Sequence, residues 1–248
     1  MVRIYDTRAG QVEEIAAGRA LRLYTCGLDA ARRAHVGDLR TFLVSDLIRR
    51  ALERRRVRVV AARDAVHDED AFRADAATLN LRPAEHVSEA GEPIPRIDLG
   101  VGGAVPRGDV HWMHTEGVRF DGDAPLLPDV ADAGLDPLAV RMAFLECHYR
   151  RPVELTWDTL RAADGRVRRW RAGVAEWSES VSAPMATAYA ERAESAFDDD
   201  LDTPAALRVL DELEGDASVA PGAKFETFLH LDSLLGLDLS SDIGKIRT

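Results

Sequence analysis

Leu21–Cys26 (LRLYTC) alternates in polarity and stops at Gly27, so it predicts a buried strand that ends in a glycine turn. Downstream, Asp38–Arg54 carries leucines and a phenylalanine at helical spacing, and Asp38 is a plausible N-cap for that helix. Val57–Ala62 (VRVVAA) predicts a second strand. This succession is a βαβ unit, which requires a parallel sheet covered by helices.

The sequence beyond this unit changes character twice. Glu69–Leu79 predicts a helix, whereas Arg82–Asp109 is rich in Pro and Gly and predicts a long loop. Short strands are expected around Trp112 and Val118. From there on the pattern predicts helices, over Pro137–Tyr149, Trp157–Trp177, Ala183–Ala196, Pro204–Glu214 and Lys224–Leu235.

Composition limits the class of protein. The 248 residues are 46% hydrophobic and 30% charged, enough for one large domain or for one domain with a helical appendix. No apolar stretch reaches the roughly 18 residues of a spanning helix, and Met1–Glu14 lacks the apolar core of a secretory signal. We therefore expect a cytoplasmic protein without a membrane partner.

The formal net charge of −11 disfavours a chain built mainly to hold nucleic acid, so tRNA is not an expected partner. The arginines between Arg161 and Arg171 form either a solvated helix face or a contact for an RNA backbone. Cys26 and Cys147 are the only cysteines, which fits a reducing compartment and excludes a zinc site made of cysteines alone.

The distribution of lysine narrows the chemistry further. Lys224 and Lys245 are the only lysines, and every other basic side chain is an arginine. A phosphate-binding or Schiff-base lysine in the main body is therefore excluded. Arginine binds phosphate, but its planar fork does not replace a mobile ammonium group.

A set of ordered motifs resembles the cysteinyl-tRNA synthetases. Leu23–Gly27 (LYTCG), His35–Asp38 (HVGD) and Arg40–Phe42 (RTF) match that family's strand ending in CG, its HIGH signature and its RTF helix. The mycothiol-pathway cysteine ligase shares this core. Further matches, in family order, are Arg3–Thr7, Phe72–Asp75, Asn80, Trp112–Thr115, Leu135–Leu138, His148–Arg150 and Asp199–Pro204.

The resemblance implies an α/β fold with a parallel sheet. We expect a Rossmann-like class I synthetase catalytic domain over residues 1–150, with a shortened insertion at about residues 82–109. A helical region is expected over residues 151–248.

The resemblance also places a phosphate site at the HVGD turn, where helix N-termini attract anions. His35 and Asp38 are the candidate catalytic residues, since His35 and Gly37 are retained and Asp38 replaces the second histidine. That acid would put negative charge where phosphate lies. Loss of one such donor typically costs about 10²–10³ in rate.

A second departure concerns the lysine loop (KMSKS) of the family. It is expected between Val118–Gly122 and Leu135–Pro137, but Asp123–Pro128 (DAPLLP) has no basic residue. No mobile cation is therefore available there to neutralise a departing pyrophosphate.

The resemblance implies a zinc ion that selects cysteine, and Cys26 matches its first ligand. The other ligands lack counterparts, and zinc needs three or four, so zinc is possible but not expected and a buried core cysteine is the simpler interpretation. Asp98–Gly103 resembles the family's adenosine turn, with Val105 in place of its ribose aspartate. The expected cofactor is ATP, and the candidate pocket residues are Cys26, Gly27, His35, Gly37, Gly102 and Gly103.

Two hypotheses of different classes follow. The first is a synthetase-like protein that has lost tRNA aminoacylation and acts through a nucleotide- or adenylate-type pocket or through a protein partner. The second is a divergent ATP-dependent ligase that activates cysteine or a related amino acid, with missing charge supplied by Arg107, Arg119 or a partner. A scaffold without small-molecule chemistry is a third possibility.

Overall fold

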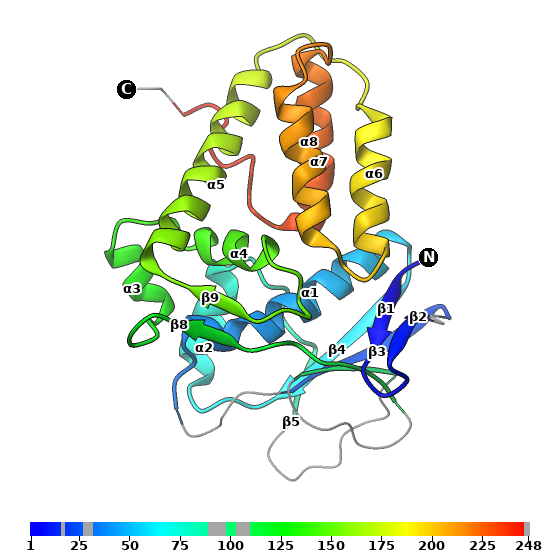
Figure 1. Cartoon of the computed structure of the whole chain (residues 1–248), viewed down its shortest axis with the longest axis vertical. Helices are drawn as coiled ribbons and strands as arrows, with labels where there is room; N and C mark the ends of the chain where they lie inside the picture. Colours follow the sequence, from blue (N-terminus) through cyan, green and yellow to red (C-terminus); the bar gives the residue numbers. More distant parts are fainter. Residues whose placement is uncertain (16–17, 27–31, 89–97, 103–109, 246–248) are drawn as a thin grey trace.

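The computed structural model describes residues 1–15, 18–26, 32–88, 98–102 and 110–245 (Figure 1). Its centre is a five-stranded sheet in the order β5-β4-β3-β6-β7, and all of its strand pairs are parallel. The expected α/β, Rossmann-like class is therefore confirmed. The strands are β3 (Ala20–Thr25), β4 (Arg58–Asp64), β5 (His86–Ser88), β6 (Leu99–Val101) and β7 (His111–Met113).

The βαβ unit forms where the sequence predicts it. Helix α1 (Leu39–Arg54) joins β3 to β4, and a short 3-10 turn, η1 (Val36–Asp38), precedes the helix. Leu23 and Thr25 face the same side of β3, because side chains alternate along a strand. Tyr24 faces the opposite side of the sheet.

The Pro- and Gly-rich stretch from Arg82 to Asp109 is not a loop throughout. It contains β5 and β6, and β6 is a central strand whose three residues are all buried. The loop prediction was wrong there because three-residue strands are too short to show alternation, and Gly100 is atypical of a strand. Residues 89–97 and 103–109 lie outside the described residues.

The helices from α4 to α8 follow the expected order, whereas α3 was not predicted. Their bounds are α3 (Leu127–Asp132), α4 (Leu138–Leu145), α5 (Trp157–Trp177), α6 (Thr187–Asp198), α7 (Thr203–Gly215) and α8 (Pro221–Leu235), and α2 (Glu69–Thr78) follows β4. β8 (Val118–Phe120) pairs in parallel with β9 (Val153–Leu155). The expected boundary near residue 150 stays a prediction.

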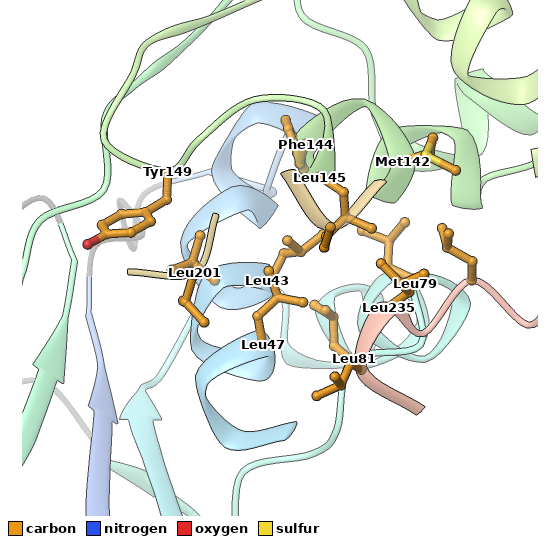
Figure 2. Packing of buried hydrophobic residues seen from close by; sticks show 14 of the residues in the cluster. Leu43, Leu47, Leu79, Leu81, Met142, Phe144, Leu145, Tyr149, Leu201 and Leu235 are labelled. Carbon is orange, nitrogen blue, oxygen red and sulfur yellow. The ribbon is translucent and has the colours of Figure 1, made fainter. Parts of the chain in front are cut away.

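The C-terminal helices stand on the other side of α1 from the sheet (Figure 1). Helix α1 contacts β3 and β4 and also α8, so it lies between the two layers. Leu43 and Leu47 of α1 belong to one continuous core with Leu145, Leu201 and Leu235 (Figure 2). In the described part of the chain, no helix combines the length and apolar character needed to cross a membrane.

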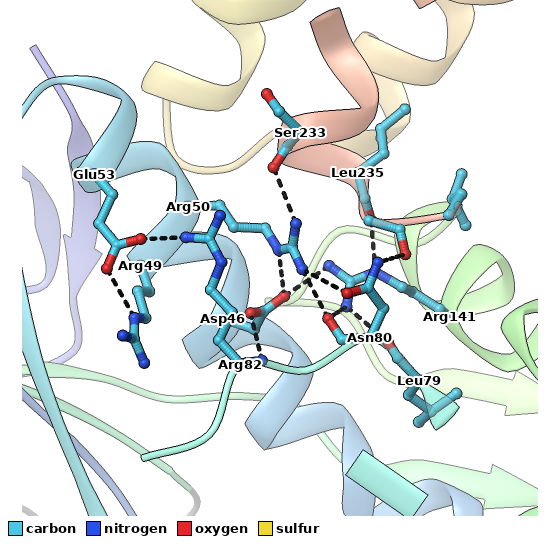
Figure 3. A network of polar contacts seen from close by, with 12 residues as sticks. Asp46, Arg49, Arg50, Glu53, Leu79, Asn80, Arg82, Arg141, Ser233 and Leu235 are labelled. Carbon is cyan, nitrogen blue, oxygen red and sulfur yellow. Dashed lines mark hydrogen bonds and ion pairs between the residues drawn. The ribbon is translucent and has the colours of Figure 1, made fainter. Parts of the chain in front are cut away.

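A buried charged network joins α1 to α4 and α8 (Figure 3). One carboxylate oxygen of Asp46 accepts from Arg50 Nε and Arg141 Nη2, each at 2.7 Å. The remaining donors of these guanidiniums bind main-chain oxygens, among them those of Asn80, Ser233 and Leu235. Burial alone would raise the pKa of Asp46, but the two arginines hold it below its usual value.

The N-terminal hairpin and the residues after α4 meet at the end of α6. β1 (Arg3–Asp6) pairs antiparallel with β2 (Gln11–Glu14), and Arg3 also bridges Asp199, at the end of α6. The backbone N–H of Tyr5 donates to Asp200 Oδ1 at 2.8 Å. Tyr149 donates to the same carboxylate, and Arg150 lies 2.6 Å from its other oxygen.

Candidate functional site

The side chain of Asp38 stabilises the HVGD turn. Asp38 Oδ2 accepts the backbone N–H of His35 at 2.8 Å, so the side chain closes the turn onto itself. Arg32 binds both carboxylate oxygens, at 2.7 and 3.0 Å. The N-cap expectation needs correction, since Asp38 occupies the cap position of α1 but its side chain does not cap that helix. The expected negative charge is present, and it is paired with Arg32.

The Asp123–Pro128 segment, where the lysine loop is expected, contacts the same turn. Pro125 O accepts the backbone N–H of Val36 at 3.0 Å. Gly37 lies against β8, since a Cβ added there would be 3.2 Å from Val118 Cβ. Protein groups therefore take up hydrogen-bonding capacity and space at this helix start.

The RTF motif acts as a structural anchor. Arg40 is 2% exposed and donates to the main-chain oxygens of Glu116 and His148, at 2.7 and 3.0 Å. Burial lowers the pKa of this guanidinium. Thr41 shares a hydroxyl hydrogen bond with Thr115 at 3.0 Å. These contacts fix the start of α1 against the segment that follows β7.

Cys26 and Gly102 meet at the carboxyl edge of the sheet, where β3 and β6 end. The backbone N–H of Cys26 donates to Val101 O at 2.9 Å, and a Cβ added to Gly102 would lie 2.6 Å from Cys26 Sγ. Cys26 is buried in a small cluster with Tyr24, Ala62 and Trp112. Gly27 and Gly103, the other two glycines expected in the pocket, lie outside the described residues.

The sheet face around Cys26 also depends on a glycine. A Cβ on Gly100 would lie 2.3 Å from the Trp112 ring, so the indole packs directly over that backbone. Tyr24 donates its hydroxyl to Asp64, at the end of β4. The carboxyl edges of parallel strands are the usual place for ligands in open α/β sheets. The structure thus brings Cys26 and Gly102 together, and separately groups His35, Gly37 and Asp38.

Among the described residues, Cys26 does not belong to a group of three potential metal ligands. In the ranges that the structure describes, one group of three potential metal ligands occurs, and it consists of Asp6, Glu13 and His111. Cys26 is not part of it. His111 Nδ1 lies 3.6 Å from Asp6 Oδ2. Sequence reasoning missed this group because its members come from three strands and form no local spacing pattern.

The chain is similar to known cysteine ligases over about half of its length. It is 34% identical over 142 residues to a cysteine–tRNA ligase of Novosphingobium aromaticivorans, a match that covers 52% of this chain and 29% of that protein. It is 36% identical over 144 residues to the L-cysteine:1D-myo-inositol 2-amino-2-deoxy-alpha-D-glucopyranoside ligase of Thermobifida fusca, covering 52% of this chain and 33% of that enzyme. No family model matches.

A third relative gives the same result. The corresponding inositol-glycoside ligase of Rhodococcus erythropolis is 33% identical over 144 residues, which is 52% of this chain and 33% of that enzyme. The matched part of the chain thus spans about a third of the length of these curated relatives. Together with the parallel sheet, the similarities identify a divergent core of the class I synthetase type. More particularly, that core is cysteinyl-tRNA synthetase-like, as the sequence motifs indicated.

Proposed function

We propose that this chain is a cysteine-ligase-like protein that does not aminoacylate tRNA and that binds an adenylate-type small molecule at the carboxyl edge of its sheet. The observation that carries the proposal is the closed helix start: the Val36 N–H is bound by Pro125 O, and Asp38 fills the HVGD turn. A triphosphate needs positive charge and N–H donors beside it. An adenylate has no pyrophosphate to release and makes a smaller demand on this turn.

The other end of the candidate pocket keeps the features that such a ligand needs. Gly102 allows β6 to approach Cys26 closely, and the adjacent strand ends carry the polar groups of Tyr24 and Asp64. Both related ligases are named for cysteine, so the ligand would include a cysteine-like part. A protein partner remains the second way in which this edge could act.

Calorimetric titration tests the proposal directly. A non-hydrolysable cysteinyl-sulfamoyl adenosine should bind the full chain saturably, whereas ATP should bind at least about a hundredfold more weakly. His35→Ala should weaken binding of the adenylate analogue, and His67→Ala, a change at an exposed histidine outside the site, should not. Tight ATP binding, or the absence of analogue binding, would refute the proposal.

The alternative is an active ATP-dependent ligase that joins cysteine or a related amino acid to a small amine. It is favoured by the similarity to the inositol-glycoside ligases, which covers about half of this chain. ATP–pyrophosphate exchange separates the two proposals. Exchange with any amino acid that is lost in His35→Ala and kept in His67→Ala would establish the ligase. A flat assay across the standard amino acids would eliminate it.

A further inference from the structure

A cavity of about 390 Å³ lies between the sheet and helices α1 and α2. The cavity lies on the sheet face that carries Leu23 and Thr25, which is the face opposite Tyr24. It is thus distinct from the Cys26 edge. Its volume falls within the roughly 300–1,000 Å³ range of small-molecule sites.

The walls of the cavity are mainly apolar. Phe42 and Phe72 meet edge to face in one wall, with ring centroids 4.7 Å apart. Leu23 of β3, Leu81 and alanines of β4 and α2 supply much of the remaining surface. Inside, the hydroxyls of Thr25 and Ser45 share a hydrogen bond of 2.6 Å. Such a surface suits an apolar body rather than a sugar or a polyphosphate.

The charged residues that line the cavity are unbalanced. They are Arg49, Arg63, Arg73 and Arg82 against the single acid Asp46. Asp46 is already bound by two further arginines in the buried network described above. The charged groups at the cavity wall are therefore mainly guanidiniums, each of which also pairs with an acid outside the lining.

The acids that pair with these arginines do not line the cavity. Glu69 binds both Nη atoms of Arg63, at 2.8 and 2.6 Å. Glu53 accepts from Arg49 at 2.8 Å and also from Arg82 (Figure 3). An incoming group would meet the guanidiniums before these carboxylates.

We propose that this cavity binds a small amphipathic anion, with an apolar tail between α1 and α2 and a carboxylate or similar group at the arginines. Shape, wall chemistry and charge all point to this class. The site is independent of the adenylate-type pocket proposed above, because it lies on the other face of the sheet.

The probes are octanoate and octan-1-ol, titrated calorimetrically into the full chain. Octanoate should bind saturably and at least about fivefold more tightly than the alcohol, since the alcohol lacks the charge. Added salt should reduce the octanoate affinity and leave the alcohol unaffected. Equal affinity for both probes, or no saturable octanoate binding, would overturn the proposal.

Matched variants locate the probe. Ala77→Leu fills the cavity from α2 and should weaken octanoate binding about tenfold or more, whereas Ala74→Leu, outside the lining of the same helix, should change it less than twofold. Octanoate that binds Ala77→Leu as tightly as wild type would lie elsewhere and refute the site. Thermal unfolding of both variants verifies that each is folded.

A second pair tests the charge. Arg73 pairs with Asp70 at 3.0 Å, and Arg161 pairs with Asp158 at 2.7 Å, both as exposed i,i+3 pairs on helices. Arg73→Gln should weaken octanoate binding about two- to fivefold, and Arg161→Gln should not. An unchanged affinity in Arg73→Gln would contradict the placement of the anionic group.

Discussion

Asp38 and Asp46 lie two turns apart along the same segment, and each binds arginine, but in opposite surroundings. Asp38 pairs with Arg32, whose side chain is 46% exposed. Asp46 pairs with Arg50 and Arg141, whose side chains are 6% and 0% exposed. The first pair closes the HVGD turn at the surface, whereas the second holds layers of the fold together. The difference indicates that two carboxylates close together in the sequence contribute very differently to stability.

The largest effect on the free energy of unfolding is expected at Asp46, which binds two buried arginines. Asp46→Asn leaves two guanidiniums buried without a counter-charge and should lower the free energy of unfolding by about 3–5 kcal/mol. Asp38→Asn should cost no more than about 1 kcal/mol, because its partner is solvated. Urea unfolding of both variants measures the difference. Equal losses would break the distinction between the two carboxylates.

The pH dependence of stability sharpens the same contrast. The arginines lower the folded-state pKa of Asp46 below its unfolded value, so its contribution is complete above the unfolded pKa. That contribution is lost as the pH falls through the folded-state pKa. The stability gap between wild type and Asp46→Asn should therefore narrow on acidification below pH ~4, as measured by urea unfolding across pH. A gap that widened in acid would contradict the assigned direction.

Much of the fold could be predicted from periodicity. The strand–helix–strand unit and the long helix α5 match the expected ranges closely, because long amphipathic segments carry a strong local signal. β5 and β6 could not be predicted, since three residues are too few for a pattern and their pairing is decided by distant strands.

The candidate site was predictable only in part. The motifs identified His35, Asp38 and Cys26, but nothing local to the HVGD sequence shows that Pro125 binds its turn or that Arg32 neutralises its acid. The Pro125 contact joins segments that are far apart in the chain, whereas Arg32 is local but does not reveal its pairing by any spacing pattern. The Asp6, Glu13 and His111 group was hidden for the same reason.

Substitution of Gly100, which lies beneath Trp112, should have an intermediate effect on stability. Gly100→Ala forces a methyl group into the indole and should destabilise the chain by about 1–3 kcal/mol. Gly117→Ala is the control, because an added Cβ there meets no atom within 4 Å. Thermal unfolding compares the two, and similar midpoints would show that the sheet adjusts freely around the ring.

The smallest effect is expected from restoring the family's second histidine. Asp38→His removes the acid, but the Val36 N–H remains bound to Pro125 O and Asp123–Pro128 still lacks a cation. ATP–pyrophosphate exchange should therefore stay at background, with unfolding stability changed by less than about 1 kcal/mol. Measurable exchange in this variant would show that Asp38 alone blocks the reaction.

The hydrogen bond between the N-terminal hairpin and Asp200 should couple the local unfolding of two segments. The first strand pairs with Asp199 and is hydrogen-bonded to Asp200, between α6 and α7. The N-terminal hairpin is therefore held in place by the C-terminal helices. Local opening between α6 and α7 should release the N-terminal hairpin at the same time. Amide hydrogen exchange would then show both segments gaining deuterium together, as a single cooperative unit.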